Sequence, residues 1–155
     1  MNINKICKFV ISVSMAFMLV ACSTSPNKPS ANGEHESVSL VVPSLQVKSD
    51  CGKCKIRNNI ASLIIDGYNK AAINAGAKIS SKSNAIITIK EYVERGDTER
   101  FLAGAFAGKD EIKASITYQG KDYFVEDYYR NAWLGIETLA TKIGELTFEK
   151  MHKKA

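Results

Sequence analysis

The stretch Glu111–Glu126, EIKASITYQGKDYFVE, decides the fold class of this chain. Its first half alternates polar residues with apolar ones, and this period of two is typical of a half-buried strand. The apolar positions are Ile112, Ala114, Ile116 and Tyr118. Gln119–Asp122 then has the composition of a turn, and Tyr123–Glu126 returns as the second strand of a hairpin. The stretch therefore predicts an antiparallel sheet with one face against a core.

Three segments before the hairpin extend this pattern. Ala85–Val93, rich in Ile and Thr, predicts a strand. Asn58–Ala75 has apolar residues three and four apart and is followed by Gly76, so it predicts a helix. Ser37–Lys48 alternates and predicts a first strand that is broken or bulged at Pro43.

The segment after the hairpin, Arg130–Met151, predicts a final amphipathic helix. Its apolar stripe is formed by Trp133, Ile136, Leu139, Ala140 and Ile143. The expected order is β-α-β-β-β-α, an α+β fold in which two packed helices cover a small, mostly antiparallel sheet. We expect one domain over residues 37–155, since 155 residues leave room for no more.

The charge balance argues against a nucleic-acid partner. The whole chain has a formal net charge of +5, but Lys5 and Lys8 belong to an amino-terminal segment that we expect to be removed. The remaining basic residues are spread along the chain among the acidic ones, whereas a nucleic-acid surface needs a clustered basic face.

Residues 1–21 have the three parts of a secretory signal. Two lysines precede the apolar run Phe9–Val20, and small residues close it. A run of about 12 residues is too short to cross roughly 30 Å of hydrocarbon comfortably. We expect residues 1–21 to be cleaved off, and residues 22–36, which hold two prolines and no apolar periodicity, to form a flexible linker.

The sequence Leu19-Val20-Ala21-Cys22 resembles the lipobox of bacterial lipoprotein precursors. The resemblance implies a diacylglyceryl group on the thiol of Cys22, cleavage before it, and acylation of the new amine. Two or three acyl chains, palmitate among them, give a stable anchor where one chain does not. Ser23 resembles the residue found in lipoproteins sent to the outer membrane of Gram-negative cells, where the domain would face the periplasm.

The rest of the chain resembles small outer-membrane lipoproteins of unknown function, the YajG-like group among them. The resemblance rests on the order of elements from Ser37 to Met151 and on Arg100-Phe101-Leu102-x-Gly104-x3-Gly108 before a strand. It implies no catalytic residues.

Cys51 and Cys54 form the sharpest local motif, Cys-Gly-Lys-Cys. Cys7 leaves with the signal and Cys22 carries lipid, so we expect these two to form a disulfide in an oxidising periplasm. Zinc and haem are disfavoured because no second Cys pair follows and Lys55 stands where haem attachment needs His. The alternative is a redox-active dithiol, favoured by the spacing, a nearby helix start and the basic neighbours Lys53, Lys55 and Arg57.

The second candidate is the uncharged run Phe101–Gly108. Its contact residues would be Phe101, Leu102, Gly104, Phe106 and Gly108. The run fits a partner-binding patch, a lip that dips into a membrane surface, or a loop packed under the final helix. We expect the packed loop, because the strand that follows has an apolar face to cover.

Nothing in the sequence assembles a catalytic site. Asp122, Glu126 and Asp127 lie in an acidic, aromatic stretch without an added nucleophile, and we expect them to mark a hairpin exit and an acid at the start of the final helix. The expected function is that of a non-enzymatic lipoprotein, a binding or assembly module with an envelope protein as partner and no cofactor. The alternative is a periplasmic thiol-redox protein that uses Cys51 and Cys54.

Overall fold

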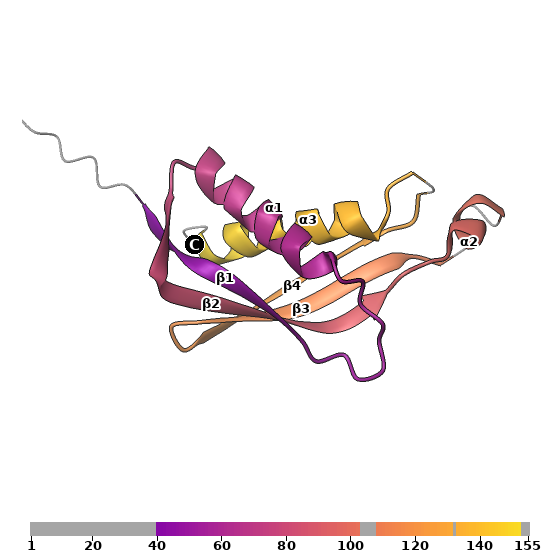
Figure 1. The fold of residues 1–155 in the computed structure, drawn as a ribbon, viewed down its shortest axis with the longest axis horizontal. Coiled ribbons are helices and arrows are strands. Elements are labelled where there is room, and N and C mark those ends of the chain that lie inside the picture. The colour runs from indigo at the N-terminus through magenta and orange to yellow at the C-terminus, as the bar shows by residue number, and fades with distance from the viewer. Residues whose placement is uncertain (1–39, 103–107, 132, 153–155) are drawn as a thin grey trace, which may run out of the picture. The chain divides into compact units, whose positions relative to one another are not determined.

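The computed structural model describes residues 40–102, 108–131 and 133–152. Its fold is α+β, as the sequence predicts (Figure 1). The elements are β1 (Val41–Ser49), α1 (Ile60–Asn74), β2 (Lys78–Val93), α2 (Asp97–Leu102), β3 (Asp110–Tyr118), β4 (Lys121–Tyr129) and α3 (Ile136–His152). The short helix α2 is an addition to the expected order. No helix within these described ranges is long and apolar enough to cross a membrane.

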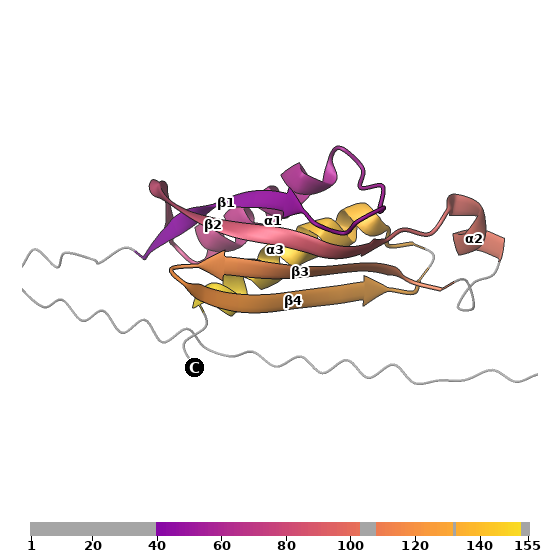
Figure 2. The same ribbon diagram turned by 90° about the horizontal axis from the view of Figure 1, so that it is seen from below.

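The four strands form one mixed sheet in the order β1-β2-β3-β4. β1 runs parallel to β2, with α1 as the crossover between them, and the other two pairings are antiparallel. Helices α1 and α3 lie side by side over one face of the sheet, and none of the described helices covers the other face (Figures 1 and 2). The alternation read from the sequence matches this layering, because Ile112, Ala114 and Ile116 are fully buried.

Two glycines set how closely the helices approach. A Cβ atom at Gly144 would lie 2.0 Å from the carbonyl oxygen of Ile64, and one at Gly67 would lie 2.0 Å from that of Thr141. No side chain fits at either position without moving a backbone. Below this crossing, Tyr68 is fully buried, and its hydroxyl donates a hydrogen bond of 2.9 Å to the carbonyl of Pro43.

The irregularity predicted at Pro43 is confirmed. The register of β1 against β2 shifts between Pro43 and Ser44, whose partners are Ser80 and Asn84. Proline has no N–H to donate, so an edge strand is the place in a sheet where it is tolerated. The predicted start of this strand, Ser37–Ser39, lies outside the described residues.

The hairpin is confirmed as well. Gln119 and Gly120 both have positive φ angles, 52° and 71°, and join β3 to β4 by a two-residue turn. Such turns need left-handed backbone at both central positions, where glycine is favoured. β4 begins at Lys121, two residues before the predicted start, because the turn is shorter than expected, and it continues to Tyr129, three residues beyond the predicted end.

The final helix begins later than predicted, and Trp133 is not part of its apolar stripe. α3 starts at Ile136, and the Trp133 side chain is 86% exposed. The side-chain oxygen of Asn131 accepts hydrogen bonds from the backbone N–H groups of Trp133 and Leu134, at 3.1 and 2.6 Å. This local turn competes with helix formation. The rest of the predicted stripe is buried.

Candidate functional site

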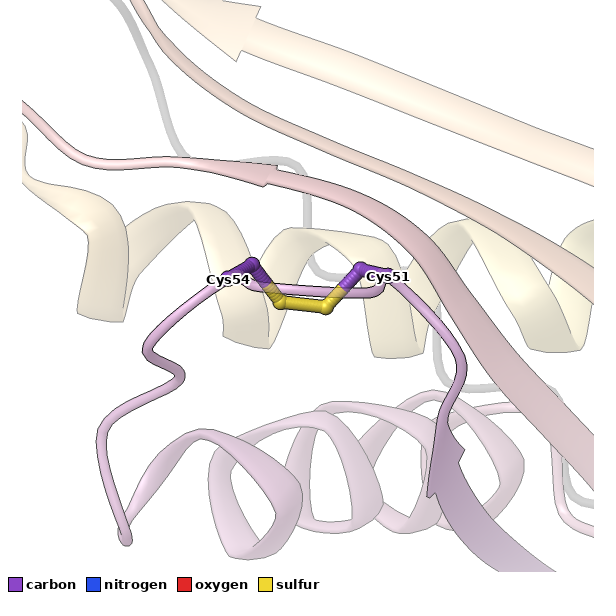
Figure 3. The surroundings of a disulfide bond; sticks show 2 residues. All are labelled: Cys51 and Cys54. Atoms are coloured by element: carbon purple, nitrogen blue, oxygen red, sulfur yellow. A yellow bond between two sulfur atoms is a disulfide. The ribbon is translucent and has the colours of Figure 1, made fainter.

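Cys51 and Cys54 form a disulfide in the loop between β1 and α1 (Figure 3). The bond encloses a tight turn in which the Cys54 N–H donates to the Cys51 carbonyl at 3.3 Å and Gly52 has a φ of 63°. Both side chains are half-buried and pack against the core. The predicted disulfide is therefore present, and it fixes the path of the chain from the sheet to the first helix.

The surroundings of this bond differ from those expected of a redox-active dithiol. α1 begins at Ile60, six residues after Cys54, while the effect of a helix dipole falls off within its first turn. Arg57 forms an ion pair with Glu94 and lies 3.7 Å from a carboxylate oxygen of Glu137. The charge of Arg57 is therefore neutralised by these carboxylates and does little to stabilise a thiolate at Cys51 or Cys54. Two of the features that favoured the redox alternative are weaker in the structure.

A buried cluster of charges lies where β2 ends and β3 begins. Asp110 is fully buried, and its two oxygens accept hydrogen bonds from the guanidinium groups of Arg95, at 2.9 Å, and Arg100, at 3.1 Å. The backbone N–H of Arg95 also donates to Asp110, at 2.8 Å. Buried charges are tolerated when they are paired and hydrogen-bonded. Here both guanidinium groups are paired with Asp110, while the Nε of each is buried without a hydrogen-bond partner among the described residues.

The two arginines join three separate segments of chain. Arg95 donates to the carbonyls of Arg130, at 3.1 Å, and Asn131, at 2.9 Å. Arg100 lies against the start of α3, where a Cβ atom on Gly135 would be 2.7 Å from its Nη1. The segment after β4 is thus held against α2 and the start of β3.

Three apolar side chains are exposed on the segments that this cluster holds together. Phe101 is 68% exposed, Trp133 86% and Leu134 39%. Phe101 belongs to α2, and the other two belong to the segment between β4 and α3. In both views these two segments lie at the same end of the sheet, the end opposite the start of β1 (Figures 1 and 2). We call these three residues the apolar tip.

The run Phe101–Gly108 is not packed as expected at the residue where its packing can be seen. Phe101 is exposed rather than buried under the final helix, and the apolar face of β3 is covered by α3. Leu102 is the last residue of α2. Gly108 is exposed with a φ of 81°, and its carbonyl lies 3.5 Å from Arg95 Nη1. Gly104 and Phe106 lie outside the described residues, as does the proposed lipid carrier Cys22.

Sequence reasoning missed Trp133 and Leu134 as surface residues. The three-residue spacing of Trp133 from Ile136 fits a helical stripe, and spacing alone cannot tell an apolar surface from an apolar core. The signal that could have found them is Asn131 ahead of Gly135, since an Asn side chain caps a turn and a Gly weakens a helix.

An open polar cleft of about 550 Å³ lies beside the disulfide loop. Its lining includes Lys55, Arg57, Tyr92, Glu94 and Asp97. The Tyr92 hydroxyl donates to Glu94 at 2.8 Å, and burial, with the Glu94 charge adding to it, raises the pKa of this phenol. Together with the Arg57–Glu94 pair, this contact joins Arg57, Tyr92 and Glu94 to one another.

The acidic residues of the hairpin take ordinary places on β4. Asp122 accepts a hydrogen bond of 2.8 Å from Thr117 across the hairpin, and Glu126 is exposed. None of them starts the final helix, because α3 begins only at Ile136. In the part of the chain that the structure describes, no group of three or more His, Cys, Asp or Glu side chains is placed to hold a metal ion.

No family model and no curated protein matches this sequence. Among solved structures, a PelC dodecamer from Paraburkholderia phytofirmans is similar at 9% identity, over 76% of this chain and 88% of that chain, with a TM-score of 0.46. A second structure, described as an uncharacterized protein, is similar at 11% identity, over 73% and 89% of the two chains, with a TM-score of 0.41. Likeness at this level says nothing about function.

Proposed function

We propose that this chain is a lipid-anchored, non-catalytic module of the bacterial envelope that makes its contacts through the apolar tip. Cys22 would carry the lipid, and the domain would face the periplasm from the outer membrane of a Gram-negative cell. The lipobox Leu19–Cys22 supports the anchor. The disulfide between Cys51 and Cys54 fits an oxidising compartment and supports export.

The observation that carries the contact surface is the apolar tip on its charged support. Single exposed apolar residues are common on protein surfaces, whereas several large ones gathered at one end of a domain favour an interaction site. The segments that carry the apolar tip are held by the buried charges. Arg95 donates hydrogen bonds to Asp110 at the start of β3 and to the carbonyl of Asn131 in the segment before α3. Surface held in place by buried charges is suited to binding, since the contact residues lose little freedom when they meet a partner.

The contact is tested by cross-linking in living cells. A photo-reactive benzoylphenylalanine at position 101 should form adducts in the envelope. The same group at position 124 is the matched control, because Phe124 is 53% exposed but lies on β4, outside the tip. Equal adducts from the two positions, or none from position 101, would contradict the proposal for the tip.

The anchor is tested by mass spectrometry of the mature protein. We expect an N-terminus at Cys22 that carries two or three acyl chains. An unmodified N-terminus at any other residue would show that the chain is not a lipoprotein, whatever the tip binds.

A thiol-redox protein is the second candidate, and the half-exposed disulfide is the observation that favours it. The reduction potential of Cys51 and Cys54 separates the two functions. A value below about −300 mV belongs to a structural bond, and one near −120 to −200 mV to an exchanging one.

A further inference from the structure

We infer that the apolar tip inserts into the interface of the lipid bilayer, as a second membrane contact besides the lipid on Cys22. This inference rests on the proposed anchoring and names the partner of the tip.

The side chains are those that membrane interfaces favour. Tryptophan is enriched where headgroups meet hydrocarbon, because its ring is apolar and its N–H is polar. Trp133 is the most exposed large apolar residue in the described part of the chain, and Phe101 follows it. Trp, Phe and Leu are also the residues that interfacial segments bury at the acyl boundary.

The area of the tip favours a bilayer over a folded protein. A whole large apolar side chain has roughly 150–250 Å² of surface. Scaled by their exposed fractions, the three side chains of the tip together offer about 400 Å² of apolar surface. A stable protein interface buries roughly 800 Å² on each partner. A bilayer sets no such minimum, because each inserted side chain leaves water on its own.

Two basic side chains lie beside the tip. Arg130 and Lys109 both approach the ring of Tyr128, at 5.4 and 5.1 Å from its centroid. Arg130 is three residues before Trp133, and Lys109 directly precedes the buried Asp110. Lys109 is paired with Glu111 at 2.5 Å, and Asp97 and Glu99 lie on α2 with Phe101, so Arg130 is the one of the two cations that can add a modest attraction to an anionic lipid headgroup.

The chain before the domain is long enough to let the tip reach the bilayer that holds Cys22. Cys22 and Leu40 are 18 residues apart, which extends to at most about 60 Å. β2, which runs along the sheet toward the tip, has 16 residues and so spans about 50 Å. The anchor keeps the local concentration of lipid high, so weak insertion by three side chains is enough.

Trp133 reports on its own insertion, because it is the one tryptophan of the sequence. The mature lipoprotein is reconstituted into vesicles of equal parts phosphatidylethanolamine and phosphatidylglycerol, with either ordinary or brominated acyl chains. Bromine quenches only fluorophores that enter the hydrocarbon. We expect the Trp133 emission in brominated vesicles to be less than half of that in ordinary vesicles. In ordinary vesicles the emission maximum should lie at a shorter wavelength than in the same domain in buffer without lipid or detergent.

Variants connect the signal to the tip. Phe101→Ser with Leu134→Ser keeps Trp133 and should abolish most of the quenching, whereas Phe124→Ser should leave it unchanged. Equal emission in brominated and ordinary vesicles would overturn the inference. So would a spectral shift that depends on protein density and not on bromine, because a second copy would then cover the tip. A missing acyl group on Cys22 refutes the anchor alone. The unacylated mature chain is then mixed with the same brominated vesicles at high lipid concentration, and unquenched Trp133 emission there also overturns the inference.

Discussion

Asp110 is the residue that holds the tip end of the sheet together. It is fully buried between two guanidinium groups, and one of these also holds the carbonyls of Arg130 and Asn131. Asp110→Asn should therefore lower the free energy of unfolding by about 3–5 kcal/mol, because it leaves buried positive charge without a counterion. Urea unfolding measures this loss.

The matched control is Glu91→Gln, which removes the acidic partner of a more exposed pair with Lys113 at 2.7 Å. Exposed pairs contribute about 0–1 kcal/mol, so this variant should unfold close to the wild type. If the two variants lose equal stability, the cluster does not support the fold in the way argued.

His152 makes stability depend on pH. It packs on the Phe148 ring at 4.9 Å between centroids, and its pocket includes Leu40, Ala75 and Glu149. Burial lowers the pKa of His152 in the folded protein below its ordinary value near 6.5. The unfolded chain then binds a proton more readily, so stability should fall as the pH drops below about 6.5.

His152→Leu should remove this part of the pH dependence. Urea midpoints between about pH 7 and about pH 5 measure it. The carboxylates of Asp50 and Glu91, whose pKa values Lys90 and Lys113 lower, act only at more acidic pH. A variant with the same slope as the wild type would show that His152 is not its source.

At the residue scale, the sequence predicted the pair Cys51–Cys54 and failed at Phe101 and Trp133. Cysteines in an exported domain have few alternatives to each other, so their pairing follows from counting. An apolar side chain is compatible with a core or with a contact surface. The sequence alone does not distinguish the two. In the structure, α1 and α3 pack against the sheet, and Phe101 and Trp133 lie exposed outside this core.

At the scale of elements, the close crossing of α1 and α3 depends on Gly67 and Gly144. Glycine has a low helix propensity, so propensity alone predicts that both residues destabilise their helices. Gly144→Ala raises helix propensity by about 1 kcal/mol. It also places a methyl group 2.0 Å from the Ile64 carbonyl oxygen, so the helices must separate. We expect a net loss of about 1–3 kcal/mol in unfolding free energy, the usual range for overpacking.

Thr138→Ala on the exposed side of α3 is the comparison. It also raises helix propensity but adds no atoms to the crossing, so we expect a change within about 0.5 kcal/mol. Gly144→Ala with stability equal to or above that of Thr138→Ala would mean that the helices do not pack this closely.

The strands show where a pattern is sufficient and where it is not. The period of two over Ile112–Tyr118 predicted β3 and its buried face. The first half of β2, Lys78–Asn84, was missed because most of it is polar. It is a strand because Val41–Pro43 pairs with its first residues, a contact between segments nearly 40 residues apart.

At the scale of the whole molecule, the proposed destination of the protein depends on Ser23. In the lipoprotein family that the lipobox resembles, Asp at this position retains the protein in the inner membrane. Ser23→Asp should therefore move the protein from outer-membrane to inner-membrane fractions of a density gradient. A wild-type protein already in the inner-membrane fraction would remove the proposed location, while the lipid on Cys22 would be unaffected.

The acidic residues of β4 lie on a free edge of the sheet, where their charge opposes pairing with another copy of the chain. β4 is the last strand of the sheet, so one row of its backbone groups has no neighbouring strand among the described residues. Asp122, Glu126 and Asp127 stand on it. Identical strands that stack in register would place each of these charges about 4.8 Å from its copy, which opposes growth of an aggregate. Replacing Glu126 and Asp127 by Thr should make the protein scatter light on standing, whereas unchanged solubility would assign the protection elsewhere.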